Sequence, residues 1–311
     1  MKRSIPVGSR ESPLALRQTE WVLRRLQAGH PHLSFELHPV LTRGDRLLAE
    51  PLPAIGEKGL FTRELENALL QRKIDFAVHS LKDVPEELPP GLVLCMVGPR
   101  EDPRDVFISR TGLTLAAMPP GAVIGTSSPR RAAQLLYFRS DLRIVSVRGN
   151  VATRIQKMEK EKLDGIVLAA AGILRLDLGE RVTEYLSPSV CLPAAGQGAL
   201  AAECRADDAD TLALLAALRH EPTELALRAE RAALRRLGGG CRLPLAALAV
   251  WTAEALSLEA LAADADGRRL VRARAAVKAP DEVAAAALGE GVAAEIVARR
   301  RAEAKGTKER S

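Results

Sequence analysis

Hydrophobic positions follow two alternating patterns along the first two-thirds of the chain. Short runs of aliphatic and β-branched residues predict strands, and apolar residues spaced three or four apart predict helices. Residues 13–27, for example, place Leu14, Trp21, Val22 and Leu26 on one helical face. The predicted strands are 4–7, 35–41, 75–78, 93–97, 106–109, 123–125, 144–147 and 165–168, and the predicted helices are 13–27, 60–72, 129–138 and 151–163. Strands alternating with helices indicate an α/β architecture with largely parallel sheets.

The pattern changes after a helical stretch at 222–237, which ends in the run Gly238-Gly239-Gly240-Cys241. Three predicted strands follow with no helix between them, and one helix follows the strands. These strands are 246–251, 256–262 and 268–277, and the helix is 281–300. This order predicts a small α+β domain, and a chain of 311 residues is long enough for two or three domains.

Charge and composition narrow the classes of function. The net charge is +6, but residues 299–311 alone hold six Lys or Arg against two acids, so the rest of the chain is nearly balanced. Aromatic residues make up only 3%, and none are interleaved with basic residues as in nucleic-acid-binding surfaces. No apolar run approaches the roughly 18 residues of a membrane span, and the N-terminus does not resemble a signal peptide. We therefore expect a cytoplasmic protein with no nucleic acid or membrane as partner.

The four cysteines are scattered at positions 95, 191, 204 and 241, with no CxxC pair. This spacing argues against disulfide frameworks and metal sites. Cys241 differs from the others because three glycines precede it, and such a run favours an exposed loop. An exposed thiol suggests a nucleophile or an attachment point, although an incidental surface cysteine is the simpler interpretation.

Hydroxyl and arginine side chains gather where predicted strands lead into helices. The first such loop has Arg10 and Ser12 before Pro13, where helix capping and anion binding are equally good interpretations. The second, 125–131, combines three hydroxyls with two arginines, and the third, 148–154, carries two more. In an open α/β sheet these loops line the ligand crevice. Three of them favour a polyanionic ligand over arginines that merely face solvent.

A fourth loop follows the buried strand 75–78 and carries His79, Lys82 and Asp83. A lone buried histidine is more often structural than catalytic. Lys82 and Asp83 could form a plain surface ion pair of little value. Alternatively, basic neighbours keep Asp83 ionised, so that it can stabilise a developing cation. The sequence leaves both interpretations open.

The order of these motifs resembles the hydroxymethylbilane synthase (porphobilinogen deaminase) family over residues 3–245, and more loosely to about 300. The matching segments are Ser-Arg-Glu-Ser-Pro-Leu-Ala-Leu (9–16), Thr-Arg-Gly-Asp (42–45), Lys-Gly-Leu-Phe (58–61), Ala-Val-His-Ser-Leu-Lys-Asp-Val-Pro (77–85), Arg-Glu-Asp-Pro-Arg-Asp (100–105), Gly-Thr-Ser-Ser (125–128), Arg130-Arg131, Arg-Gly-Asn (148–150), Gly-Gln-Gly (196–198) and Gly-Gly-Cys (239–241). Each segment is short, but their joint order and spacing are very specific.

The resemblance implies two α/β lobes like those of type II periplasmic binding proteins, with a deep cleft between them, and a small C-terminal α+β domain. The implied first lobe is discontinuous and comprises 1–99 and 194–216. The second lobe would be 100–193, and the third domain, with the cofactor-anchoring loop and the basic tail, would be 217–311. We expect a monomer.

The resemblance also implies the chemistry. A dipyrromethane cofactor would be joined by a thioether to Cys241, and four porphobilinogen units would be added to it with release of ammonia, before hydrolysis frees hydroxymethylbilane. Asp83 would be catalytic. The cofactor would be held by Lys82, Asp83, Thr126, Ser127, Ser128, Arg130 and Arg131, the substrate by Arg10, Ser12, Gln18, Arg148 and Arg154, and a flap would carry Lys58 and Phe61. The partners would be porphobilinogen and the growing oligopyrrole chain.

Two positions depart from the family pattern. Pro129 stands where leucine is usual, at the first position of a helix, where proline costs little. Glu57 replaces a glycine in the expected flap, which predicts a stiffer flap. The main alternative function is a non-catalytic, two-lobed binding protein for a polycarboxylate ligand, since a fold by itself does not imply catalysis. Cys241 and Asp83 discriminate, because a mere binder needs neither.

Overall fold

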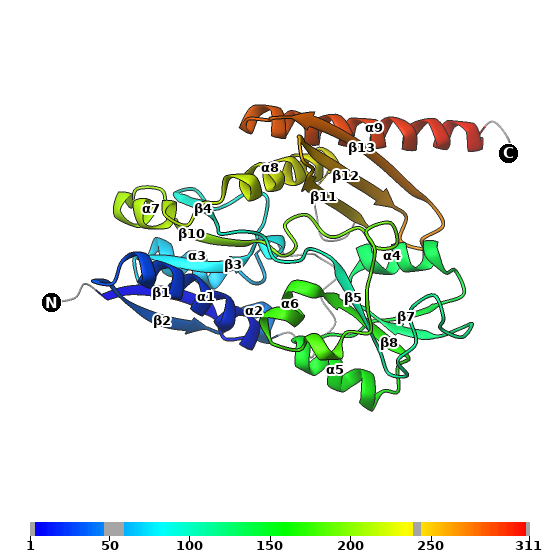
Figure 1. Ribbon diagram of the computed structural model, residues 1–311, viewed down its shortest axis with the longest axis horizontal. Coiled ribbons are helices and arrows are strands. Elements are labelled where there is room, and N and C mark those ends of the chain that lie inside the picture. Colours follow the sequence, from blue (N-terminus) through cyan, green and yellow to red (C-terminus); the bar gives the residue numbers. More distant parts are fainter. Residues whose placement is uncertain (1–3, 47–58, 239–243, 309–311) are drawn as a thin grey trace.

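The computed structural model describes residues 4–46, 59–238 and 244–308, and three β-sheets organise them (Figure 1). The first sheet has the order β2-β1-β3-β10-β4. Its strands are β1 (Ser4–Arg10), β2 (Ser34–Val40), β3 (Phe76–Ser80), β4 (Leu92–Val97) and β10 (Leu200–Arg205). β1 runs parallel to β2 and β3, whereas β10 is antiparallel to both of its neighbours. The α/β architecture is therefore confirmed, but the sheet is mixed rather than largely parallel, because β10 returns between β3 and β4 in the opposite direction.

Helices cover both faces of the first sheet. They are α1 (Pro13–Gly29) and α7 (Ala209–Ala216) on one face and α3 (Arg63–Leu70) on the other, and the short α2 (Arg43–Arg46) follows β2. Val22 and Leu26 of α1 belong to the same buried cluster as Val7 and Phe76 of the sheet. Leu65 and Leu69 of α3 pack in a separate cluster with Ile74, Ala77 and Leu92. In both helices, the apolar residues that were predicted to share one face therefore do face the sheet.

The second sheet has the order β7-β6-β8-β5-β9. Its strands are β5 (Asp105–Ser109), β6 (Val123–Gly125), β7 (Arg143–Val145), β8 (Gly165–Ala169) and β9 (Glu184–Tyr185), and its helices are α4 (Pro129–Phe138), α5 (Val151–Lys160) and α6 (Ala170–Arg175). β6 is parallel to β7 and β8, and β5 is antiparallel to β8. The two α/β units meet where α1 packs against α6.

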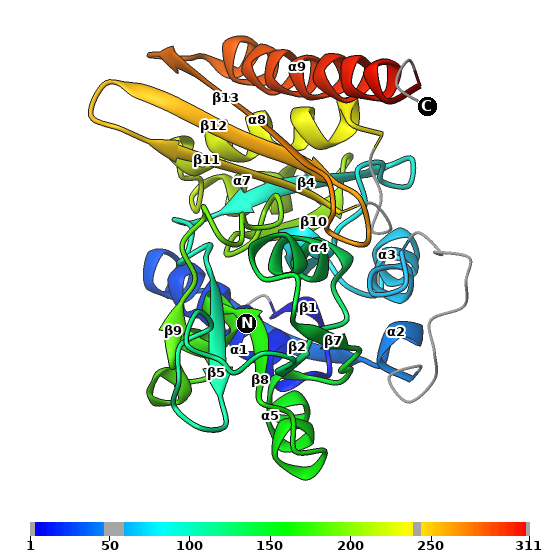
Figure 2. The same cartoon turned by 90° about the vertical axis from the view of Figure 1, so that its right-hand side faces the viewer.

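The third sheet is antiparallel and comprises β11 (Leu245–Trp251), β12 (Ala255–Ala263) and β13 (Leu270–Lys278). Figure 2 shows α8 (Glu221–Arg236) and α9 (Glu282–Lys308) beside this sheet. Their side chains share one buried cluster with it, so two helices cover the sheet where one was predicted. A β-carbon at Gly289 of α9 would lie 2.2 Å from the Ala229 carbonyl oxygen of α8, so this close helix contact requires glycine.

The sequence pattern did not predict α2, α6, α7, β9 and β10. β10 reads Leu-Ala-Ala-Glu-Cys-Arg and has no β-branched residue, so propensity alone gives a weak strand signal. All six of its residues are buried between β3 and β4, and this tertiary burial makes the segment a strand. Among the described residues, none of the helices has the length and apolarity to cross a membrane. The same part of the chain has no cluster of metal-ligating side chains.

A group of buried ionisable side chains lies between α3 and the first sheet. Nε2 of His79 is 3.1 Å from Oε2 of Glu203, and both side chains are almost inaccessible to solvent. Glu66 of α3 is buried beside them. Burial raises the pKa of Glu66, and the nearby Glu203 raises it further, while His79 and Arg63 oppose the shift. His79 is therefore part of the core, as the structural interpretation of this residue had it.

We expect Glu66→Gln to stabilise the protein at pH 8. The pKa of Glu66 is higher in the folded state than in the unfolded state, so folding favours the protonated carboxyl. Its contribution to stability is present below the unfolded pKa and is lost as the pH rises through the folded pKa. The amide removes that loss, so the variant should have a higher Tm than wild type at pH 8 and a much smaller gain at pH 5. Thermal unfolding at both pH values measures this. The exposed Glu20→Gln should change neither value, and an equal gain at both pH values would contradict the prediction.

Candidate active site

Three helices begin directly after strands of the two α/β units, and each has a side-chain cap. The hydroxyl of Ser12 accepts from Ala15 N at 3.3 Å, that of Ser128 from Arg131 N at 3.4 Å, and Asn150 Oδ1 from Thr153 N at 2.8 Å. Pro13 and Pro129 are the first residues of α1 and α4. The predicted capping role of Ser12 is therefore confirmed, and proline fits the start of α4 as expected.

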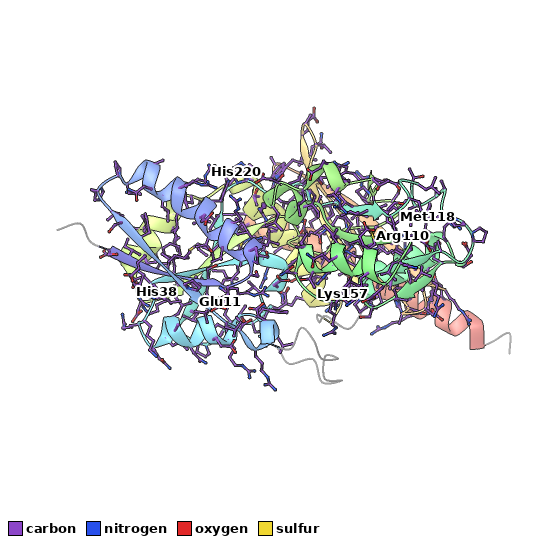
Figure 3. All side chains as sticks on the ribbon, turned by 90° about the horizontal axis from the view of Figure 1, so that it is seen from below. Glu11, His38, Arg110, Met118, Lys157 and His220 are labelled. Atoms are coloured by element: carbon purple, nitrogen blue, oxygen red, sulfur yellow. The ribbon has the colours of Figure 1, made fainter. Side chains whose placement is uncertain are left out.

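The loops of the two units bring one carboxylate and several cations together. Burial lowers the pKa of Arg154 in α5 to about 10, with further lowering by Arg131 and Arg148 and an opposing effect of Asp83. Asp83 lies in the 3₁₀ turn Leu81–Asp83 that follows β3 of the first sheet, whereas the arginines belong to the second unit. Residues that the sequence predicts to bind cofactor and substrate thus share one electrostatic site. Figure 3 labels one residue in each of two segments beside this site: Glu11 in the loop before α1, and Lys157 in α5.

Lys82 stands next to Asp83 in the same turn, and solvent reaches its side chain. Crowding by protein atoms nevertheless lowers its pKa to about 8, with Arg131 and Arg130 adding to the shift and Asp83 and Asp105 opposing it. Its Nζ donates to Oε1 of Gln197 at 3.3 Å. Lys82 thus contacts Gln197 in addition to facing Asp83, which is more than a plain surface pair would show.

Asp105 at the start of β5 binds both arginines of α4. Arg130 Nη1 lies 2.8 Å from Asp105 Oδ2, and Nε and Nη2 of Arg131 donate to Oδ1 at 3.0 and 2.7 Å. The three side chains are at most 7% exposed. Burial alone would raise the pKa of Asp105, but the two guanidiniums outweigh it and hold the pKa far below its usual range. One buried carboxylate therefore neutralises part of the cationic site.

Arg130 and Arg131 also bind backbone carbonyls. Arg130 Nη1 donates to Leu192 O at 2.6 Å, and Arg131 Nη1 donates to Val167 O at 3.1 Å. Both arginines, which were predicted to bind the cofactor, thus also stabilise the second α/β unit. Cys191 belongs to a buried apolar cluster of the second unit, and its Sγ donates to Asp105 Oδ2 at 3.2 Å. Burial, with Asp105 adding to it, raises the pKa of this thiol to about 12.

The predicted substrate residues of the first unit also have protein partners. Gln18 is buried, and its Nε2 donates to the Ser80 hydroxyl at 2.8 Å at the end of β3. Arg10 binds Asp45 through Nε and Nη2 at 3.2 and 2.5 Å, and its guanidinium lies 4.2 Å from the centre of the Phe61 ring. The sequence singled out both Arg10 and Phe61, and the structure brings them together by a cation–π contact.

The remaining predicted residues are only partly placed. Thr126 is buried, and its hydroxyl accepts from Ser128 N at 3.2 Å, while Ser127 is half-buried between them. Lys58 of the predicted flap and the predicted anchor Cys241 lie outside the described residues. No contact described here tests the binding roles of these residues, which stay predictions.

Sequence reasoning missed Asp105, Gln197 and Asp45. All three lie in segments that matched the family, but nothing in their local sequence indicates a role. Asp105 and Gln197 contact charged side chains that are 25 to 115 positions away in the chain. Such partners can be identified only when the loops are placed in space.

Two protein-family models match most of this chain. Residues 5–213 match the family model described as porphobilinogen deaminase, dipyromethane cofactor binding domain, and residues 225–298 match the model of the porphobilinogen deaminase C-terminal domain. Among solved structures, CbnR, a LysR family transcriptional regulator, aligns over 69% of this chain and 68% of its own, with 12% identity and a TM-score of 0.45.

Curated relatives match over most of their length. The porphobilinogen deaminase of Syntrophotalea carbinolica is 55% identical over 86% of this chain and 85% of its own. That of Desulforudis audaxviator is 53% identical over 88% and 89%, and that of Moorella thermoacetica is 51% identical over 95% and 93%. Two family models and near-complete relatives at this identity leave one conclusion: the chain belongs to the porphobilinogen deaminase family.

Proposed function

We propose that this enzyme is a hydroxymethylbilane synthase. It joins four porphobilinogen units head to tail on a dipyrromethane primer with release of one ammonia per unit, and then hydrolyses the linear product from the primer. The observation that carries the proposal is the gathering of four cations (Lys82, Arg131, Arg148 and Arg154) and Asp83 in one electrostatic site. Porphobilinogen carries an acetate and a propionate, so a chain built from it is a polycarboxylate that needs such cations.

The cationic site also fits the cofactor, because dipyrromethane carries the same carboxylates. The residues that would hold it are Lys82, Thr126, Ser127, Ser128, Arg130 and Arg131, with Cys241 as the covalent anchor. When bound, it supplies the pyrrole carbon to which the first porphobilinogen is joined. Arg10, Ser12, Gln18, Arg148 and Arg154 would receive the carboxylates of the incoming substrate. Because Arg130 and Arg131 also bind Asp105, their guanidiniums are oriented before any ligand binds.

Asp83 stabilises the transition state of each addition. When the amino group of porphobilinogen leaves as ammonia, an electron-poor cation remains on the substrate. A fixed carboxylate favours that cation. The site therefore binds anionic groups through its cations and offers one negative charge where positive charge develops.

The proposal includes the three-domain division, with 1–99 and 194–216 in the first domain, 100–193 in the second and 217–311 in the third. The position of β10 between β3 and β4 supports the return of the chain to the first domain. We further propose a cytoplasmic monomer whose partners are porphobilinogen and the growing oligopyrrole, with no nucleic acid or membrane involved.

The intact mass of the purified protein tests the proposal. We expect an increment equal to one covalently bound dipyrromethane, because the primer is not released with the product. Cys241→Ser should lack the increment, since the hydroxyl is a far weaker nucleophile than the thiolate. Cys95→Ser is the matched control and should keep it. Active wild-type protein of unmodified mass would contradict the proposed mechanism, and an increment retained by the Cys241 variant would show that the anchor is elsewhere.

A further inference from the structure

The side chain of Gln197 lies between the two α/β units and is only 1% exposed. Its Nε2 donates to the Pro103 carbonyl at 2.7 Å and to Asp105 Oδ1 at 2.9 Å. Its Oε1 accepts from Lys82 Nζ at 3.3 Å. One buried amide thus joins the turn after β3 to the carboxylate that binds Arg130 and Arg131.

The neighbours of this amide determine its orientation. The nitrogen faces a carbonyl and a carboxylate, which can only accept hydrogen bonds, and the oxygen faces an ammonium, which can only donate. A flipped amide would oppose oxygen to two acceptors and nitrogen to a cation, so only one orientation is compatible with these contacts.

The backbone on both sides of Gln197 is held equally firmly. Gly196 N donates to Glu230 Oε2 at 2.7 Å, and Arg100 Nε donates to the Gln197 carbonyl at 2.7 Å. Gly198 has φ +88°, and a β-carbon there would lie 2.4 Å from the Glu101 carbonyl oxygen. The glycines therefore let the chain pass closely between its neighbours, and the Gln197 side chain projects from a fixed position.

We propose that Gln197 is a positioning residue, whose amide fixes the Lys82 ammonium of the first unit relative to the Asp105–Arg131 pair of the second. This inference rests on the proposed function in so far as Lys82 and Arg131 bind the polycarboxylate. The physical reason is complementary charge: the amide gives Lys82 an acceptor and Asp105 a donor without adding net charge. Lys82 otherwise faces Asp83 on its own turn, Asp105 of β5, and Arg130 and Arg131 of α4.

The test replaces Gln197 with methionine, which has a similar size but no hydrogen-bonding groups, and with glutamate. Trace acylation by acetic anhydride, followed by peptide mass spectrometry across pH, reports the midpoint at which Lys82 loses its proton. The methionine variant should lower this midpoint by about one pH unit, because one unit corresponds to roughly 1.4 kcal/mol and a hydrogen bond to a charged group is worth at least that. The glutamate variant should raise the midpoint, since a carboxylate beside Lys82 favours the ammonium.

The measurement uses the holoenzyme, and each variant is compared with wild type of equal cofactor content. A second series in the Cys241→Ser background gives Lys82 titrations without an attached group, so this arm does not depend on the proposed function. In the holoenzyme, kcat/KM of the methionine variant should fall about tenfold, as expected for the loss of one charge-assisted bond.

Gln134→Met is the matched control. Gln134 is also 1% exposed in the second unit, but it binds the backbone of Leu192 rather than Lys82 or Asp105. It should lose stability without moving the Lys82 midpoint. If both Gln197 variants keep the wild-type midpoint, the proposal is overturned. If one Gln197 variant does not fold, the direction in which the Lys82 midpoint moves in the other variant still tests the proposal. A wild-type protein without the dipyrromethane increment would sink the proposed function alone.

Discussion

Replacing Asp83 with asparagine is expected to lower kcat at least a hundredfold and to leave KM nearly unchanged. The substitution removes a charge while nearly preserving shape. If the carboxylate stabilises a cation that forms only near the transition state, its loss acts on the chemical step rather than on substrate binding. Groups of this kind are typically worth roughly 10²–10³ in rate, or about 3–4 kcal/mol. The proximity of Asp83 to Arg154 places this carboxylate among the cations of the site.

Single-turnover kinetics on protein already loaded with cofactor measures this effect, because cofactor assembly could itself require Asp83. Asp177→Asn is the control, since the side chain of Asp177 is 80% exposed and 3.9 Å from its nearest cation, Arg17. It should leave the rate unchanged. A cofactor-loaded Asp83→Asn variant whose rate is within a few-fold of wild type would remove Asp83 from the mechanism.

Replacing Asp105 with asparagine is expected to cost about 3–5 kcal/mol of stability, because it leaves the buried Arg130 and Arg131 without their counter-charge. The contribution of Asp105 to the stability of the wild-type protein also depends on pH. The pKa of Asp105 is lower in the folded state than in the unfolded state, where it is about 4. The stability that its carboxylate contributes is therefore present above the unfolded pKa and is lost as the pH falls through the folded pKa. The difference between wild type and variant should therefore be full at neutral pH and shrink below about pH 4.

Urea unfolding at pH 7 and in the acid range measures both statements. Asp102→Asn is the matched control three residues earlier, since Asp102 binds the half-exposed Arg104 and should cost at most about 1 kcal/mol. A similarly small loss for the Asp105 variant would mean that the arginines find other partners. Because Arg130 and Arg131 depend on Asp105 and on backbone carbonyls, their own replacement would lower stability as well as ligand binding. Arg148 and Arg154 are therefore better probes of carboxylate binding.

The apolar spacing of the sequence predicted most helices and strands, since residues that share a face lie three, four or two positions apart. The helix starts were equally predictable, because a cap acts within one turn: Ser12 and Ser128 each bind the backbone three residues on. The strand β10 was missed because it has no β-branched residue and is ordered by burial between its neighbours. The helices α6 and α7 were missed because they have only six and eight residues, too few to show a helical period clearly.

The family resemblance placed Asp83, Lys82 and the arginines in one site, and their mutual electrostatic effects agree with this prediction. It did not predict which of them also hold the fold. Arg130 and Arg131 appeared only as ligands of the cofactor, whereas the structure pairs both with a carboxylate 25 and 26 residues earlier.

By itself, the sequence determined the α/β architecture, the capped helix starts and the residues that carry charge into the loops, because each depends on neighbours within a few positions. Only the tertiary structure decided that Asp105 neutralises the two arginines, that Gln197 joins Lys82 to Asp105, and that His79 lies against Glu203 in the core. The physical reason is that hydrogen bonds and ion pairs act over about 3–4 Å, so they depend on which distant loops the fold brings to that separation.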